Sequence, residues 1–231
     1  QYNLNEEDFR GEILKSHPVS LKGNNDILSL TKPQIIKEIH SKYLNAGADI
    51  IETNTFNATT ISQADYKTES LVYEMNKVSA SLAKEVADYF TEQNPSKPRF
   101  VCGSIGPTNK TASMSPDVND PSYRAVSFDD VKNSYKIQIK GLLDGGAELL
   151  MIETVFDTLN AKAAIYAVQE CFDEMNIQVP LMISGTITDA SGRTLSGQTL
   201  EAFVISVSHL PLLSVGLNCS LGAYELKPHI H

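Results

Sequence analysis

The chain has 231 residues, of which 42% are hydrophobic and 20% are charged, a composition typical of a folded globular domain rather than a disordered chain. Its formal net charge of -9 argues against the basic surface that a nucleic-acid-binding protein needs. No apolar run reaches the about 18 residues of a membrane helix. We therefore expect neither a nucleic-acid partner nor a membrane partner.

The three cysteines are Cys102, Cys171 and Cys219. They are too few for a disulfide scaffold, and their odd number is typical of a reducing compartment. The first residues also lack the basic-then-apolar layout of a signal peptide. The sequence therefore predicts a cytoplasmic protein.

In the N-terminal half, a segment with helical periodicity precedes each of two short apolar runs. Thr31 and Gln34 form a capping-box pattern with Pro33 between them, which predicts a helix that ends at Gly47. A second helix is predicted over residues 69–90, where apolar side chains recur every three or four positions. The runs at residues 49–53 and 99–103 lack polar alternation, so they are predicted to be buried parallel strands.

The C-terminal half continues this alternation. Further helices are predicted to begin at three capping residues, Ser127, Asp157 and Thr199. Further strands are predicted over residues 149–154, 181–185 and 214–219. Long polar loops, at residues 106–123 and 185–198, each follow a predicted strand and are expected to act as lids or binding surfaces.

The alternation of strands and helices predicts an α/β fold with a parallel sheet. The stretches 46–53 and 145–154 repeat the order of helix stop, acid, strand and Glu-Thr, which favours a repeating fold such as a (β/α)8 TIM barrel. A complete barrel has eight strands in about 250 residues, whereas this chain shows only the runs named above. The pattern alone leaves two alternatives, an open α/β sheet or a barrel whose strands at both ends are absent from the chain.

In either fold, reactive groups collect where parallel strands end. Glu153 ends an apolar run, and a buried carboxylate there needs a cationic or hydrogen-bonding partner. A ligand ammonium group and the amides of a neighbouring loop are both possible partners. Cys219 ends the last predicted strand, where its sulfur is either a thiolate at an open mouth or a small buried hydrophobe. No Cys-x-x-Cys or His-x-x-x-His spacing provides a self-contained zinc site.

Several long stretches together resemble the homocysteine S-methyltransferase module of cobalamin-dependent methionine synthase. They are collinear over nearly the whole chain, which makes the resemblance more specific than any single motif. The stretches are residues 21–33, 46–60, 106–121, 152–164, 183–199 and 216–222.

This resemblance implies a partial (β/α)8 TIM barrel. The predicted strands correspond to the second to sixth of the family, so residues 1–231 are expected to form one homocysteine S-methyltransferase domain, truncated at both ends and lacking the first, seventh and eighth strands. The family binds zinc through one cysteine after the sixth strand and an adjacent pair after the eighth. Cys219 matches the first of these ligands, and the pair has no counterpart in this sequence.

The resemblance also implies the reaction. Zinc activates the homocysteine thiol, which takes a methyl group from methylcobalamin on a separate domain and becomes methionine. By resemblance, Cys219 is the catalytic zinc ligand and Glu153 holds the substrate ammonium. Backbone amides near Gly103 and Ser104 are expected to bind the substrate carboxylate, and Thr55 and Asn218 are further expected contacts. The implied partners are homocysteine and the cobalamin and folate domains of the same polypeptide.

With one zinc thiolate of three, the chain alone is expected to retain little zinc and to be inactive. One alternative is a cobalamin-independent homocysteine methyltransferase that uses betaine or a sulfonium donor, although the loop at residues 106–121 resembles the cobalamin family more. The other is a non-catalytic barrel fragment that self-associates through open sheet edges.

Overall fold

The computed structural model describes residues 2–188 and 191–229. Its five strands are β1 (Ile50–Glu52), β2 (Phe100–Ile105), β3 (Leu149–Val155), β4 (Leu181–Gly185) and β5 (Ser214–Leu217). They form one sheet in the order β1-β2-β3-β4-β5, with parallel pairing between β1 and β2, β3 and β4, and β4 and β5. The register between β3 and β4 shifts between Ile152 and Val155. The α/β fold and all the predicted strand positions are confirmed. The sheet of the described residues has five strands rather than the eight of a closed barrel.

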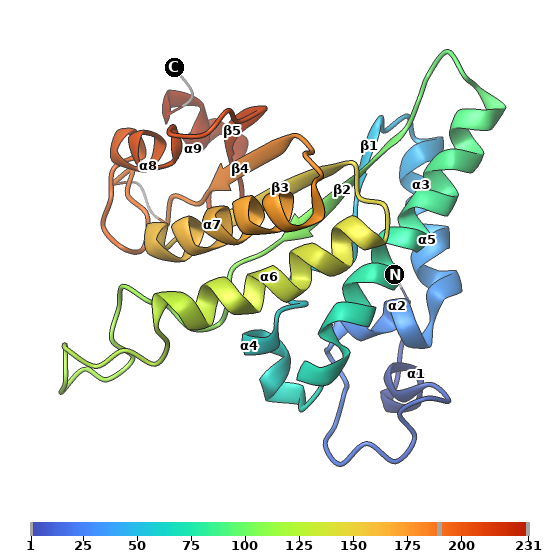
Figure 1. Ribbon diagram of the computed structural model, residues 1–231, viewed down its shortest axis with the longest axis horizontal. Coiled ribbons are helices and arrows are strands. Elements are labelled where there is room, and N and C mark those ends of the chain that lie inside the picture. The colour runs from blue at the N-terminus through green and yellow to red at the C-terminus, as the bar shows by residue number, and fades with distance from the viewer. Residues whose placement is uncertain (1, 189–190, 230–231) are drawn as a thin grey trace. The chain divides into compact units, whose positions relative to one another are not determined.

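Helices connect and flank the strands (Figure 1). Before β1 lie α1 (Glu6–Arg10), α2 (Leu28–Thr31) and α3 (Pro33–Asn45), and between β1 and β2 lie α4 (Thr60–Gln63) and α5 (Val72–Gln93). The later connections contain α6 (Phe128–Asp144), α7 (Thr158–Met175) and α8 (Leu200–Val207), and α9 (Ala223–Leu226) follows β5. Short 3-10 turns lie at Asn25–Ile27, Ala64–Tyr66, Glu69–Leu71 and Lys227–His229. Among the described residues, no helix is both long enough and apolar enough to cross a membrane.

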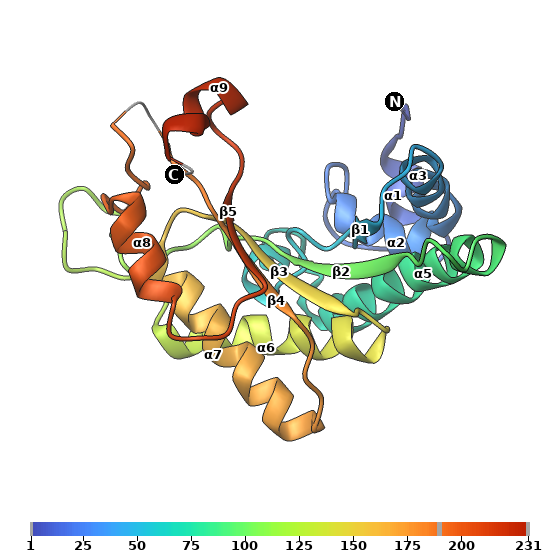
Figure 2. The ribbon, with the colours of Figure 1, turned by 90° about the horizontal axis from the view of Figure 1, so that it is seen from above.

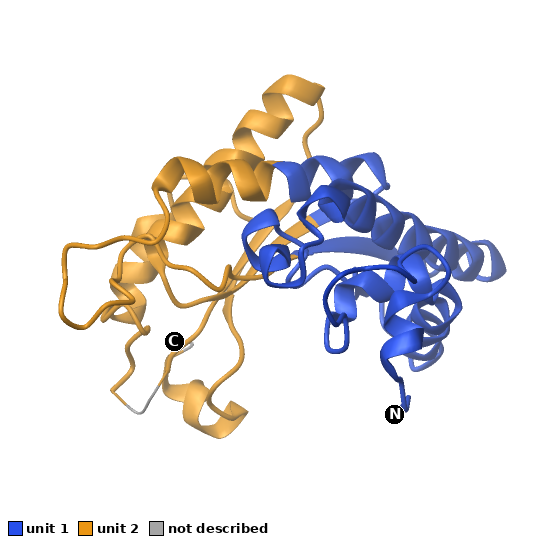
Figure 3. Ribbon diagram, turned by 90° about the horizontal axis from the view of Figure 1, so that it is seen from below, with its two compact units in different colours: residues 1–104, 137–149 blue, residues 105–136, 150–231 orange. Residues whose placement is uncertain are grey.

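The chain divides into two compact units (Figure 3). Unit 1 comprises residues 1–104 and 137–149. Its strands β1 and β2 pack their buried Ile51 and Val101 in a cluster with Leu44 of α3 and Ala83 and Val86 of α5. Val86 lies on the apolar stripe that the helical periodicity predicts for residues 69–90.

Unit 2 comprises residues 105–136 and 150–231. Helix α7 covers one face of β3 and β4 (Figure 2), and both strands are largely buried. Helix α8 adds Phe203, which is fully buried and lies so close to Gly185 that an added Cβ there would be 2.7 Å from the ring. By contrast, most of β5 is exposed, as expected for a strand at a sheet edge.

Three of the four predicted helix caps are confirmed. Ser127 accepts from the amide of Asp130, Asp157 caps α7, and Thr199 caps α8. The capping box predicted at Thr31 is wrong, because Thr31 is the last residue of α2 and its hydroxyl donates to the carbonyl of Ile27. Pro33 still begins α3.

Two predicted boundaries also shift. Glu69–Leu71 forms a 3-10 turn, so the long helix begins at Val72. Strand β5 ends at Leu217 rather than at Cys219, because Cys219 and Ser220 both have left-handed backbones, with φ of 63° and 59°.

Candidate functional site

In unit 1, the structure brings together Thr55 and Ser104, two of the predicted substrate contacts. Ser104 and Gly103 lie within β2, which extends to Ile105. The hydroxyl of Thr55 is fully buried and donates to the carbonyl of Ser104 at 2.7 Å. The amide of Ser104 in turn donates to the hydroxyl of Thr53 at 3.0 Å. These polar groups therefore tie the end of β1 to the end of β2, while direct contact of Thr55, Gly103 or Ser104 with substrate stays a prediction.

Gln138 and Asp26, which are not predicted from the sequence as site residues, form hydrogen bonds with residues 55–57 after β1. Gln138 on α6 is fully buried and donates from Nε2 to the carbonyl of Thr55 at 2.8 Å. The carboxylate of Asp26, which is 4% exposed, accepts from the amide of Asn57 at 2.9 Å. Burial raises the pKa of Asp26 to about 6, and the hydrogen bond from Asn57 lowers it less. Gln138 lies three positions after Tyr135 and four before Leu142, both buried apolar residues of α6, and this spacing is a signal for a buried polar contact. Nothing around Asp26 in the sequence indicates its burial.

In unit 2, Asn218 links the ends of three strands. Its Oδ1 accepts from the amide of Thr154 at 3.1 Å and from the hydroxyl of Ser184 at 2.7 Å. Its Nδ2 donates to the hydroxyl of Thr154 at 2.8 Å. Thr154 has a left-handed backbone, with φ of 57°. Its two hydrogen bonds with the Asn218 side chain stabilise this conformation. Asn218 therefore shapes the carboxyl edge of the sheet, and its contact with substrate stays a prediction.

Cys219 follows directly and is exposed. Cys219 and Ser220 both have left-handed backbones and lie in the turn after β5. The hydroxyl of Ser220 donates to the carbonyl of Thr188 at 3.2 Å. Of the alternatives for this sulfur, a small buried hydrophobe is therefore wrong. The two other cysteines, Cys102 and Cys171, are buried.

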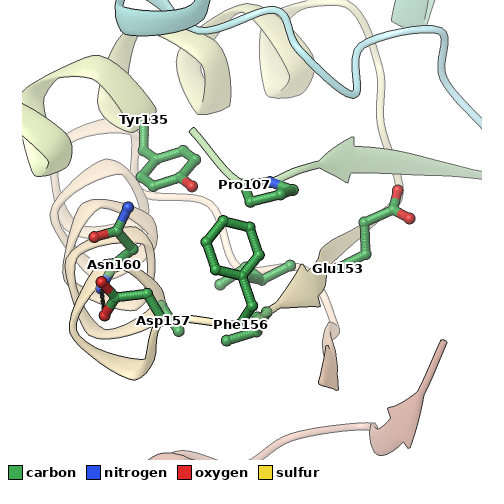
Figure 4. A pocket seen from close by; sticks show the side chains of 9 residues that line it. Pro107, Tyr135, Glu153, Phe156, Asp157 and Asn160 are labelled. Carbon is green, nitrogen blue, oxygen red and sulfur yellow. Dashed lines mark hydrogen bonds between the residues drawn. The ribbon is translucent and has the colours of Figure 1, made fainter. Parts of the chain in front are cut away.

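Glu153 lies on β3 beside a small cavity of about 10 Å³ (Figure 4). The ring of Phe156 lies in the middle of this site, with Asp157 and Asn160 on one side and Glu153 on the other, and the carboxyl group of Glu153 points away from Asn160. The lining residues are Pro107, Tyr135, Ile152, Glu153, Val155, Phe156, Asp157, Asn160 and Ala161. Glu153 is partly exposed, as a ligand-binding carboxylate needs to be. Cys219 is not among the described residues that line this cavity.

The residues present do not make a complete metal site. Among the described residues, no group of three or more His, Cys, Asp or Glu side chains is placed to hold a metal ion. Cys219 alone offers an exposed thiol, and a structural or catalytic zinc requires at least three protein ligands. A zinc ion held by these residues by themselves therefore does not fit the structure.

Comparison with solved structures places the fold. The chain matches the homocysteine methyltransferase MmuM from Escherichia coli in its metallated form, with 23% sequence identity and a TM-score of 0.69 over 89% of this chain and 70% of that chain. The apo form matches with 22% identity and a TM-score of 0.64, over 88% of this chain and 68% of that chain. These similarities support the partial-barrel fold.

The sequence model of the family described as "Homocysteine S-methyltransferase" matches residues 1–231, the whole chain. The strand-end residues that the structure places in each unit lie within this match. The chain belongs to the homocysteine S-methyltransferase family.

Proposed function

We propose that this chain is the homocysteine-binding module of a cobalamin-dependent methionine synthase, in which homocysteine accepts a methyl group from methylcobalamin on a separate domain. The family match over the whole chain is the observation that carries the choice of homocysteine as substrate. The resemblance of residues 106–121 to the cobalamin family supports methylcobalamin as the methyl donor. The folate domain of the same polypeptide is the further partner that this proposal implies.

In this proposal Glu153 binds the substrate ammonium. Its carboxylate is partly exposed at the end of β3, while the strand beneath it is buried. A carboxylate at such a boundary is less hydrated than one on an open surface, so an ion pair formed there is stronger than a fully solvated one. Glu153 therefore orients the amino-acid end of homocysteine.

Cys219 would contribute one thiolate ligand to a zinc ion. The metal in the metallated MmuM structure supports a metal in the family, and a thiolate-bound zinc keeps a substrate thiol deprotonated. Because no three possible metal ligands are grouped together among the described residues, we expect zinc binding to need further ligands. Zinc titration with a chromogenic chelator as competitor tests this, with Cys219→Ser as the matched variant. Stoichiometric tight binding by the chain as it stands would contradict the expectation.

Binding of L-homocysteine tests the proposal itself. In NMR titrations of the chain, we expect L-homocysteine to shift resonances near β3, and Glu153→Gln to weaken binding at least about tenfold through loss of the charge-assisted pair. Glu225→Gln, at another exposed glutamate of unit 2, is the control. Equal affinities of the wild type and Glu153→Gln, or no binding to the wild type, would refute the assignment.

The methyl donor is tested separately. A cobalamin-independent enzyme would use betaine or a sulfonium compound instead. The full polypeptide, supplied with L-homocysteine and each donor in turn, should form methionine only with methylcobalamin. Turnover with betaine or a sulfonium donor would favour the alternative.

The isolated chain should transfer no methyl group and should self-associate. Strand β5 exposes Val215 at the sheet edge, and Leu213 beside it is also exposed. Light scattering that shows a monodisperse monomer would contradict this expectation. The cytoplasmic location stays a prediction from the sequence.

A further inference from the structure

The root of the loop after β2 is bound by one side chain of α7. Asn160 is 5% exposed, and its Oδ1 accepts from the amide of Ala112 at 2.9 Å. Its Nδ2 donates to the hydroxyl of Thr108 and to the carbonyl of Lys110, both at 2.9 Å. The side-chain carboxamide of Asn160 thus uses its oxygen and both of its N–H groups to bind residues 108–112, which lie about 50 positions earlier in the chain.

Asp157 extends the same contact by one residue. Its Oδ2 accepts from the amide of Ser113 at 3.1 Å and from the Ser113 hydroxyl at 2.6 Å. Its Oδ1 caps α7 by accepting from the amide of Leu159 at 2.9 Å. One buried carboxylate therefore fixes the start of the helix and the loop together. We call Asp157 and Asn160 with their partners at residues 108–113 the loop clamp.

The loop clamp adjoins the cavity beside Glu153. Pro107, the residue before the clamped segment, lines that cavity together with Asp157, Asn160 and Glu153 (Figure 4). The hydroxyl of Tyr135, which also lines it, donates to the carbonyl of Gly106 at 3.0 Å. A shift of residues 106–113 would therefore move Pro107, which lines the same cavity as Glu153.

The outer half of the loop is bonded differently. The hydroxyl of Ser115 donates to the carbonyls of Asp117 and Asp120, and the carboxylate of Asp120 accepts from Ser122. These bonds stay inside the loop, and Val118 at its tip is 93% exposed. The two halves of the loop are thus held by different partners, and the inner half is the one whose bonds to the helix after Glu153 are seen among the described residues.

We propose that Asp157 and Asn160 are positioning residues, which hold the inner half of this loop against the Glu153 side of the substrate site and so set the preference for a ligand with an α-amino group. This rests on the proposed binding of the homocysteine ammonium by Glu153. The loop clamp touches no substrate in this account; it acts through Pro107 and Phe156, which lie between it and Glu153.

Hydrogen exchange of the chain tests the loop clamp without any ligand. Asn160→Ala should accelerate exchange of the amides of Ala112 and Ser113 by about tenfold or more, because hydrogen-bonded amides exchange through opening. Exchange over residues 115–124 should stay within about twofold. Asn133→Ala, at an exposed asparagine of α6, is the matched control. Unchanged exchange at Ala112 and Ser113 in Asn160→Ala would overturn the proposal.

A second pair of variants leaves both α7 residues in place. Thr108→Val removes one acceptor of Asn160, and Ser113→Ala removes one donor to Asp157. Both should accelerate exchange over residues 108–113, and the double variant should exceed the single ones. No effect in either would refute the loop clamp even if Asn160→Ala does not fold.

Ligand selectivity tests the positioning role. L-homocysteine and 4-mercaptobutyrate, which lacks the amino group, are titrated into wild type and Asn160→Ala. The proposal predicts that the variant weakens binding of L-homocysteine at least about threefold more than binding of 4-mercaptobutyrate. Equal weakening would reveal a merely structural role and would overturn the proposal. If the wild type binds neither compound, the homocysteine assignment fails, and hydrogen exchange still decides whether the loop clamp exists.

Discussion

Two buried ionisable groups of unit 1, His40 and Asp26, should give the protein a stability that barely changes with pH in mild acid. His40 is 5% exposed on α3, and burial lowers its pKa from 6.5 to about 4. Burial raises the pKa of Asp26 from 3.8 to about 6. Between pH 6.5 and about pH 4, the unfolded chain binds a proton at His40 that the folded chain excludes. His40 therefore makes the free energy of unfolding fall as pH falls. Asp26 has the opposite effect, because the folded chain keeps a proton that the unfolded chain releases.

The two effects have opposite signs and partly cancel. From pH 7 to pH 5, linkage gives a loss of about 2 kcal/mol in the free energy of unfolding from His40 and a gain of about 1 kcal/mol from Asp26. The wild type should therefore change by less than about 1 kcal/mol from these groups. Glu6, whose pKa is lowered to about 2 by hydrogen bonds from Ser20 and Leu21, titrates below this range in the folded chain.

Urea unfolding followed by far-UV circular dichroism measures this balance, since the chain has no tryptophan. Asp26→Asn should lose about 2 kcal/mol between pH 7 and pH 5, because the His40 term remains alone. His40→Gln should instead gain about 1 kcal/mol over the same range. His209→Gln and Asp173→Asn, at exposed positions, are the controls. Parallel pH profiles for the wild type and Asp26→Asn would refute the reasoning.

Three further predictions concern packing and surface charge. Gly141→Ala should lower the free energy of unfolding by about 2 kcal/mol in urea titrations, because its Cβ would lie 2.6 Å from the carbonyl oxygen of Tyr73. Asn133→Ala is the control. Equal stabilities of the wild type and Gly141→Ala would contradict this close packing. Gly185→Ala should lower the free energy of unfolding by about 1 to 3 kcal/mol, because the added Cβ would meet the ring of Phe203. Phe203→Leu should restore part of this stability by vacating the space that the ring occupies. Additive losses of stability in the double variant would exclude a steric cause. Lys136→Ala, which removes surface ion pairs to Glu170 and Glu174, should shift the melting temperature by less than about 2 °C, and a larger shift would show a stronger network.

Some of the site could be predicted from the sequence. Glu153, Asn218 and Cys219 are strand-end residues, and a strand end is visible as the end of an apolar run. The side-chain amide of Asn218 links Thr154 and Ser184, and Cys219 is exposed, while the contacts of these residues with substrate or zinc stay predictions. Partners such as these lie about 30 to 60 positions away along the chain, and single-sequence periodicity carries no information about them.

The sequence by itself determined the order of strands and helices, three of the helix caps, and the family. These properties depend on local patterns: apolar period, capping chemistry and turn residues within a few positions. Only the tertiary structure decided that Thr31 closes a helix instead of opening one, that Asp26 and Gln138 hold the segment after β1, and that Asn160 fixes residues 108–112. The reason is that a buried polar group needs a partner, and in these cases the fold supplies that partner from a distant segment that no local pattern specifies.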